Sequence, residues 1–258
     1  DVKNGIPINI SDPIEPKLAG CSTQDACYNE SVFDSTPGGV TYDGATSASI
    51  FYIDKSGGDY YTDPMMLTAA HVIDSSHCAG ESFDYSRTVT QHCETWGDPY
   101  WASPRRDAVI CEATASGKSV DNNIRDASGN LYPVSGHVTQ NGVANMISTG
   151  ETAYKTGIMT GDSSGPVLRM NLGNSSVCHD WNFEGVEIDV YATSGDSGGP
   201  MYDIDGGDAY MISVFSTSGS GSTGIFDCEG QEYNYYCYGP TAYDLVTYYN
   251  GSFVYAGV

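Results

Sequence analysis

Gly195-Asp196-Ser197-Gly198-Gly199-Pro200 is the stretch that decides the fold. Its glycines let the chain make a tight turn from which the serine hydroxyl projects. In such a turn, the backbone N–H groups of Gly195 and Ser197 can point to one place and stabilise a negatively charged oxygen. A structural turn in a glycine-rich loop is the alternative, but a six-residue string of this kind is poorly explained by chance. The stretch therefore predicts a nucleophilic serine at position 197.

A serine hydroxyl is a weak nucleophile and needs a general base. Leu67-Thr68-Ala69-Ala70-His71 offers a histidine after an apolar strand end and two small residues. The base in turn needs a carboxylate that fixes its tautomer, and Arg106-Asp107-Ala108-Val109-Ile110 places one at the start of an apolar strand. Asp84 and Asp98 are the spare candidates, but no apolar strand follows either. The predicted catalytic residues are His71, Asp107 and Ser197.

Together, these three blocks resemble those of the chymotrypsin-like serine proteases, and their bacterial branch more than the animal one. The order histidine, aspartate, serine is that family's order and differs from the order in subtilisins and α/β-hydrolases. The resemblance implies an all-β fold of two six-stranded antiparallel β-barrels with the active site between them. It also implies an oxyanion hole formed by Gly195 and Ser197. A serine endopeptidase that acts through an acyl-enzyme, with no cofactor and no metal, is expected. An esterase-type acyl hydrolase and an inactive protease-like binding module are the alternatives.

The organisation of the chain agrees with a division into two barrels. Residues 1–40 are rich in Pro, Ser and Asp and are expected to form an N-terminal arm. The polar stretch 112–130 is the best linker candidate. We therefore expect the first barrel at 41–128, and the second barrel, with a short C-terminal helix, at 129–258.

Local patterns predict several elements. Alternating strand and turn signals predict hairpins over residues 48–61 and 201–214. Apolar residues at helical spacing predict a helix over 241–249, which Asn250-Gly251 can end.

Two further segments resemble the substrate-binding parts of the bacterial proteases. Ser216-Thr217-Ser218-Gly219-Ser220-Gly221 is similar to the strand that pairs with the substrate backbone, so Thr217, Ser218 and Gly219 are expected to bind substrate. By family position, the floor of the specificity pocket is Tyr191, with Ala192 and Thr193 along its wall. No aspartate occupies that floor, and Asp189 lies two residues away, so an apolar or aromatic preference is expected.

Gly161-Asp162-Ser163-Ser164-Gly165-Pro166 mimics the nucleophile stretch but lacks its second glycine. The preceding Lys155-Thr156-Gly157-Ile158-Met159-Thr160-Gly161 resembles a second-barrel strand of the bacterial proteases, so a hairpin beside the pocket is expected there. The resemblance also implies an internal basic partner for Asp196, because the chain does not begin with the Ile or Val that animal members insert. The sequence leaves that partner open among Lys155, His137 and Arg169.

The charge is strongly acidic, with 33 Asp and Glu against 10 Lys and Arg and a formal net charge of −23. Such a surface repels phosphate backbones and anionic membranes, so polypeptide substrates are expected and nucleic acid and membrane partners are not. A monomer is expected. A saline habitat and an ordinary acidic secreted protein both fit this charge. No apolar run approaches the roughly 20 residues of a membrane span.

Eight cysteines indicate an extracellular, disulfide-bonded protein, and an N-terminal Asp1 in place of Met fits a trimmed product. Sequence spacing favours short loops, so the expected pairs are Cys21–Cys27, Cys78–Cys93 and Cys228–Cys237, which leaves Cys111 with Cys178. A zinc site at His77-Cys78 and His92-Cys93 is the less favoured reading of those residues. A calcium site in the turn at Asp203, Asp205 and Asp208 is likewise less favoured than a charged hairpin turn.

Overall fold

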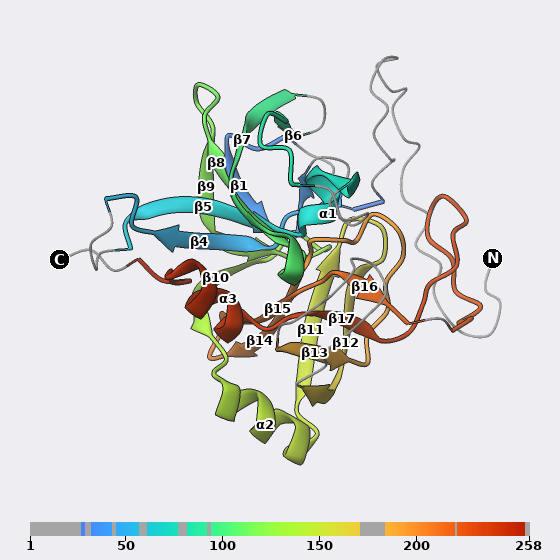
Figure 1. The fold of residues 1–258 in the computed structure, drawn as a ribbon. Helices are drawn as coiled ribbons and strands as arrows, with labels where there is room; N and C mark the ends of the chain where they lie inside the picture. Colours follow the sequence, from blue (N-terminus) through green and yellow to red (C-terminus); the bar gives the residue numbers. More distant parts are fainter. Residues whose placement is uncertain are drawn as a thin grey trace.

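The computed structural model describes residues 27–28, 32–42, 45–56, 61–76, 82–91, 94–170, 184–219 and 221–255. This part of the chain is mostly β, with sheets of ten, five and two strands and three α-helices (Figure 1). The all-β prediction is therefore confirmed. The strand pairing does not by itself establish two six-stranded barrels, because the larger sheet runs without a break through ten strands.

The five-stranded sheet has the order β4-β5-β8-β7-β6 and lies in the upper half of Figure 1. Its strands are β4 (Ser49–Ile53), β5 (Asp63–Thr68), β6 (Val89–Gln91), β7 (Glu94–Ser103) and β8 (Ala108–Ala113). β4 and β5 form the first predicted hairpin. β5 and β8 are antiparallel, with Thr68 opposite Val109. The chain therefore leaves β5 and enters β8 at the same end of the sheet, where His71 and Asp107 follow and precede these strands.

The ten-stranded sheet has the order β1-β9-β10-β15-β14-β11-β12-β13-β17-β16, and β11 to β17 lie in the lower half of Figure 1. Its strands are β1 (Ser35–Gly38), β9 (Ser119–Arg125), β10 (Leu131–His137), β11 (Thr152–Gly157), β12 (Gly161–Met170), β13 (Gly185–Ile188), β14 (Pro200–Asp205), β15 (Asp208–Val214), β16 (Thr217–Ser218) and β17 (Cys237–Pro240). β14 and β15 form the second predicted hairpin around Asp205 and Asp208. The small third sheet pairs β2 (Thr41–Tyr42) with β3 (Ala45–Thr46).

The polar stretch expected as a linker contains a strand. β9 pairs in parallel with β1, which lies in the expected N-terminal arm, and antiparallel with β10. Ile124 is fully buried, whereas most side chains of β9 are partly or fully exposed. With a single fully buried side chain, β9 lacks the alternation of apolar and polar residues that marks a half-buried strand. Its sequence therefore resembles that of a linker.

The C-terminal helix is confirmed as α3 (Ala242–Tyr249), and Asn250 ends it in the left-handed conformation. A second helix, α2 (Gln140–Thr149), was not expected. The Thr139 hydroxyl caps its first turn by accepting from Gly142 N at 3.2 Å, and Gly150 ends it with a φ of +69°. None of the helices in the described ranges is long and apolar enough to cross a membrane.

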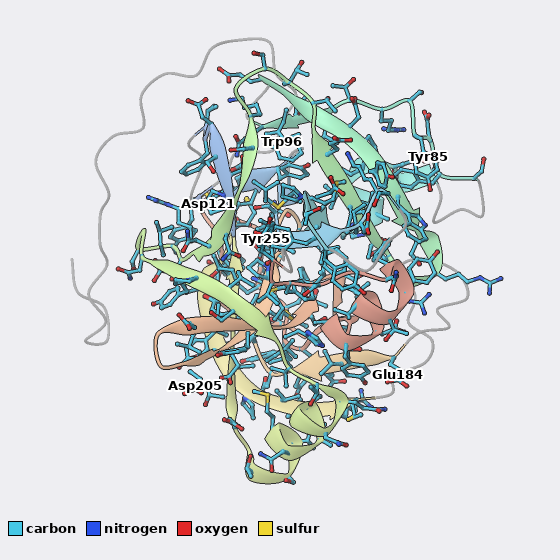
Figure 2. All side chains as sticks on the ribbon, turned by 90° about the vertical axis from the view of Figure 1, so that its left-hand side faces the viewer. Tyr85, Trp96, Asp121, Glu184, Asp205 and Tyr255 are labelled. Atoms are coloured by element: carbon cyan, nitrogen blue, oxygen red, sulfur yellow. A yellow bond between two sulfur atoms is a disulfide. The ribbon has the colours of Figure 1, made fainter. Side chains whose placement is uncertain are left out.

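A shared core joins the two large sheets. One cluster of buried side chains includes Phe51 and Leu67 from the five-stranded sheet, Tyr202 and Met211 from the ten-stranded sheet, and Leu245 from α3. Side chains fill the space between the elements, whereas Asp205 and Glu184 lie at the outer rim (Figure 2). The two sheets are therefore held against each other by buried apolar area, the main favourable term in folding.

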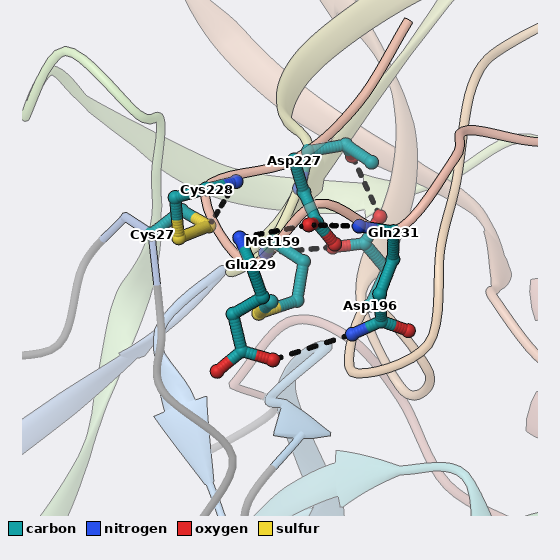
Figure 3. Close-up of a disulfide and its surroundings, with 8 residues drawn as sticks. Cys27, Met159, Asp196, Asp227, Cys228, Glu229 and Gln231 are labelled. Carbon is teal, nitrogen blue, oxygen red and sulfur yellow. Dashed lines mark hydrogen bonds between the residues drawn. A yellow bond between two sulfur atoms is a disulfide. The ribbon is translucent and has the colours of Figure 1, made fainter.

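The described disulfide joins Cys27 to Cys228, which are 201 residues apart (Figure 3). The expected pairs Cys21–Cys27 and Cys228–Cys237 are therefore wrong. Cys111 and Cys237 are buried and take part in no disulfide within the described residues, so the pair Cys111–Cys178 is wrong as well. The expected pairs followed from short spacing along the chain, whereas the fold brings together residues 27 and 228 from opposite ends of the sequence. Cys78–Cys93 lies outside the described residues, as do Cys21 and Cys178 themselves.

Candidate active site

Asp107 holds His71 by two hydrogen bonds. Its Oδ2 lies 2.7 Å from His71 Nδ1, and its Oδ1 accepts from His71 N at 2.9 Å. Asp107 is fully buried, and His71 sits in the short helix α1 (Ala70–Ile73) directly after the end of β5. The small residues Ala69 and Ala70, both fully buried, leave room for the ring. Because Nδ1 is engaged by the carboxylate, Nε2 is the ring nitrogen left to exchange a proton.

Ser216 is a third member of this arrangement that sequence reasoning did not assign. Its hydroxyl donates to Asp107 Oδ2, and the side chain is 2% exposed. The signal was its place directly before the predicted substrate strand, but the sequence does not show that its side chain turns toward Asp107.

Burial and the neighbouring Asp107 act on the pKa of His71 in opposite directions. Burial of the ring lowers its pKa and is the largest single influence. The attraction of Asp107 and its hydrogen bond together outweigh burial, so the pKa of His71 lies above its ordinary value. The arrangement therefore favours the imidazolium form that a general base acquires after taking a proton.

The turn that carries Ser197 uses its glycines as the sequence predicts. Gly195 and Gly198 have φ values of +99° and +86°, which side chains strongly disfavour. Thr46 docks the turn, because Thr46 Oγ1 donates to Gly195 O at 3.0 Å and Thr46 N donates to Ser197 O at 2.9 Å. A Cβ on Gly198 would lie 2.0 Å from Thr68 Oγ1. The serine turn is thus in direct contact with the segment that leads into His71.

Within the described residues, Ser197 Oγ makes no hydrogen bond to His71. Catalytic hydrogen bonds are often long or poorly aligned without substrate and tighten when substrate binds. The structure therefore brings the two segments together without closing this bond.

The backbone of the turn leaves two donors unused. The N–H groups of Asp196, Gly198 and Gly199 donate to Thr193 O, Phe215 O and Asp196 O. Among the described residues, the N–H groups of Gly195 and Ser197 meet no acceptor. These are the two donors predicted for the oxyanion hole, and donors without a protein partner are what such a hole requires.

Lys155 is the basic partner of Asp196. Its Nζ lies 2.7 Å from Asp196 Oδ2, and both side chains are fully buried. Arg169 instead pairs with Glu187, and His137 packs beside Phe253. Thr160 Oγ1 donates to Asp196 Oδ2 at 2.6 Å, and Met159 N donates to Oδ1 at 2.9 Å.

The two predicted substrate-binding segments lie on either side of residues 234–238. Ala192 exchanges two backbone hydrogen bonds with Asn234. Thr217 and Ser218 form β16, which pairs with β17 and is the last strand in the order of the sheet. Gly219 N donates to Tyr235 O and Tyr236 O. β16 therefore has one side free of described strands, as a strand that pairs with an extended peptide requires.

Tyrosine rings gather at the predicted pocket floor. The ring of Tyr191 lies 5.2 Å from that of Tyr235 and 6.4 Å from that of Tyr233, measured between centroids. Burial raises the pKa of Tyr233 to about 12 and is also the main cause of the raised pKa of Tyr191. Both hydroxyls therefore stay neutral at physiological pH. Thr193, the other predicted wall residue, is buried and donates its N–H to Asp196 Oδ2 at 3.2 Å.

The second Gly-Asp-Ser stretch lies in β12, paired with β11 in the hairpin that the sequence predicts. The Ser163 hydroxyl donates to Tyr191 O at 3.3 Å, which places this hairpin beside the predicted pocket. In the described ranges no three His, Cys, Asp or Glu side chains are grouped to hold a metal ion, and Asp203, Asp205 and Asp208 fall within those ranges. His77-Cys78 and His92-Cys93 lie outside them.

Several solved structures share the fold of this chain. Protease A of Thermobifida fusca matches with a TM-score of 0.57 and 19% identity, over 86% of this chain and 99% of that one. A Nocardiopsis protease matches with a TM-score of 0.56 and 22% identity, over 84% and 97%. Chymotrypsin of Cellulomonas bogoriensis matches with a TM-score of 0.56 and 19% identity, over 86% and 99%.

Sequence comparison alone finds no such relatives, since no family model and no curated protein matches the chain. Identities of this size establish the architecture and not the activity. The chain therefore has the fold of the bacterial chymotrypsin-like serine proteases.

Proposed function

We propose that this protein is a serine endopeptidase in which Ser197 is the nucleophile, His71 the general base and Asp107 the carboxylate that orients it. The observation that carries the proposal is the pair of hydrogen bonds that Asp107 accepts from His71, with the Ser197 turn packed against the segment that precedes this histidine. The raised pKa of His71 supports the same roles, since the neighbouring carboxylate favours the imidazolium formed during the reaction.

The steps follow from these positions. Ser197 Oγ attacks the carbonyl carbon of the scissile bond while His71 Nε2 takes its proton. The carbonyl oxygen becomes an oxyanion and is bound by the N–H groups of Gly195 and Ser197. His71 then gives its proton to the leaving amine, and an acyl-enzyme remains. A water molecule, deprotonated by His71, attacks the ester, and the acid product leaves with Ser197 restored.

The substrate is proposed to be an extended polypeptide that pairs with β16 through Thr217, Ser218 and Gly219. Its side chain before the scissile bond would enter between this strand and the Tyr191–Thr193 segment. The tyrosines at that place supply apolar rings and neutral hydroxyls, which favours apolar or aromatic side chains over charged ones.

Further parts of the proposal concern architecture and location. We place His71 and Asp107 on a first β-barrel and Ser197 on a second, with the site between them. The Cys27–Cys228 disulfide supports a secreted protein, since such bonds persist in oxidising compartments. A net charge of −23 argues against nucleic acid and anionic membranes as partners, and a monomer is proposed.

An organophosphonate probe and a peptide library test the proposal together. Ser197→Ala should abolish both probe labelling and peptide hydrolysis, because no other residue would supply the nucleophile. Ser163→Ala and Ser164→Ala are matched controls from the similar stretch in β12 and should retain both. Labelling that survives Ser197→Ala, but not Ser163→Ala or Ser164→Ala, would overturn the assignment.

The same experiment separates the alternatives. An esterase would be labelled and would hydrolyse ester substrates, but would leave every peptide in the library intact. An inactive binding module would not be labelled at all.

A further inference from the structure

Asp107 has an unusual backbone conformation for a residue on which a reaction depends. Its φ is +47°, in the left-handed region that non-glycine residues rarely adopt. Such a conformation costs of order 1–3 kcal/mol and persists only where the surroundings enforce it. The two neighbouring residues, Arg106 and Ala108, are both held by contacts with α3.

Arg106, the residue before Asp107, is bound to the C-terminal helix. Its Nε donates to Asp244 Oδ2 at 2.7 Å and its Nη2 donates to Asp244 Oδ1 at 3.0 Å. Both side chains are mostly buried, at 18% and 13% exposure. The guanidinium carbon also lies 4.1 Å from the centroid of the Tyr248 ring. A bidentate pair stacked on a ring fixes the guanidinium in both position and orientation.

Tyr249 ties the residue after Asp107 to the same helix. Its hydroxyl donates to Ala108 O at 2.8 Å, and the side chain is 1% exposed. Its ring packs against Phe51 and Trp101, at centroid distances of 5.8 and 5.2 Å. The acceptor is a fully buried backbone carbonyl, which would be costly to leave without a partner.

The strand that leads into α3, β17, positions a further contact of Asp107. Ser216 N donates to Tyr238 O at 2.9 Å, and Thr217 pairs with Tyr238 across β16 and β17. This backbone contact places the Ser216 hydroxyl, which donates to the carboxylate. One continuous segment, residues 237–249, therefore holds Asp107 from its two neighbours and from its own side chain.

We propose that Arg106 and Tyr249 are positioning residues that hold Asp107, through α3, in the geometry that orients His71. Neither side chain is assigned contact with substrate. This assignment deepens the proposed function and rests on it, since it gives α3 a part in the reaction. Loss of either contact lets the strained backbone at Asp107 relax, so the carboxylate moves away from His71 Nδ1.

The first test measures the pKa of His71 by NMR titration in a Ser197→Ala background, where no turnover is needed. Arg106→Ala and Tyr249→Phe should each lower the pKa of His71, because Asp107 is the charge that raises it against burial. Thr247→Ala is the matched control on the same helix. Among the described residues, the exposed Thr247 hydroxyl bonds only to Tyr243 O within α3, so the pKa of His71 should not change.

The second test measures kcat and KM with Ser197 intact. Arg106→Ala and Tyr249→Phe should lower kcat by about 10- to 100-fold with KM within about twofold, the size of effect expected for misplaced catalytic groups. Arg106→Lys keeps the charge but not the bidentate geometry and should recover only part of the loss. Asp244→Asn should resemble Arg106→Lys.

A lower melting temperature with an unchanged His71 pKa and unchanged kcat would mean that α3 only stabilises the fold, and would overturn the inference. If Arg106→Ala does not fold, Tyr249→Phe and Arg106→Lys decide by the same criteria. Failure of the proposed function gives a different result. The wild-type protein would then not react with the organophosphonate probe and would not hydrolyse peptides. The NMR titration would still report whether α3 positions Asp107.

Discussion

Lys155 Nζ lies 2.7 Å from Asp196 Oδ2, in a place where neither side chain is exposed to solvent. This ion pair fixes the residue directly before Ser197. Gly157 makes the approach possible, because a Cβ there would lie 2.1 Å from Asp196 Oδ1 and 2.8 Å from Lys155 Nζ. The turn that carries the proposed nucleophile is therefore anchored from inside the protein.

Removal of the lysine charge should damage both stability and activity. Lys155→Met keeps the length of the side chain but leaves Asp196 buried without a counter-charge, which costs about 3–5 kcal/mol of unfolding free energy. Peptide hydrolysis should fall strongly, because the turn around Ser197 would move. Urea unfolding and kcat/KM measure the two effects.

Two further variants check the cause of that loss. Lys55→Met removes a partly exposed ion pair with Glu112 and should cost less than about 1 kcal/mol. Lys155→Met with Asp196→Asn should recover part of the stability lost in Lys155→Met alone, because no unpaired charge remains. Equal costs for Lys155→Met and Lys55→Met would contradict the role given to the buried pair.

The acid limb of the pH profile should reflect the Asp107–His71 contact. Because the pKa of His71 is raised, kcat/KM should begin to fall at a pH above the ordinary histidine value of 6.5. Asp107→Asn should move this limb below 6.5, since burial then acts alone, and should lower kcat roughly 10⁴-fold. A pH–rate series on both proteins measures the limb, and an unmoved limb in Asp107→Asn would refute the assignment.

The same contact affects stability with a definite sign. A raised pKa in the folded state means that protonated His71 stabilises the fold fully below pH 6.5, its unfolded value, and that this contribution is lost as pH rises through the folded pKa. Unfolding free energies across pH 5–9 should therefore show a decrease in wild type that Asp107→Asn lacks.

The Cys27–Cys228 bond should support activity as well as stability. Cys27 N and Tyr28 N both donate to Ile158 O, at 2.9 and 2.8 Å, directly before the residues whose N–H groups bind Asp196. Replacement of both cysteines by serine should cost about 2–4 kcal/mol and lower kcat/KM. Thermal unfolding and peptide hydrolysis measure these effects.

A reductant supplies the control for this bond. The reductant should lower the melting temperature and kcat/KM of the wild-type protein. It should have little further effect on either quantity in the protein that has both cysteines replaced by serine. A reductant effect of equal size in both proteins would instead point to another disulfide.

Salt should stabilise the protein. A net charge of −23 repels itself in the compact state, and at 0.1 M salt the screening length is already about 10 Å. The melting temperature should therefore rise along a NaCl series that starts at low ionic strength. Sucrose does not screen charge, so the melting temperature should still rise with NaCl when sucrose is present. A melting temperature that does not change with NaCl would contradict the expectation.

Some features were readable from short stretches of sequence. The glycines around Ser197, the small residues before His71 and the apolar strand after Asp107 each meet a local requirement, so the fold class and the candidate triad follow from them. The hairpin at 201–214 and the helix at 241–249 also carry their own turn and capping signals. α2 had such signals too, in Thr139 and Gly150, but its polar surface concealed them.

Other features were decided only by the tertiary structure. The choice of Lys155 for Asp196, the bond from Cys27 to Cys228 and the hydrogen bond from Ser216 to Asp107 join residues 41, 201 and 109 positions apart. Which side chains meet over such separations depends on strand order and register, since a shift of one residue turns every side chain of a strand to the opposite face. The sequence by itself thus determined the chemical groups and their local turns. Packing of the sheets around a shared core decided the partners of those groups, because only there do distant charges and thiols come within bonding distance.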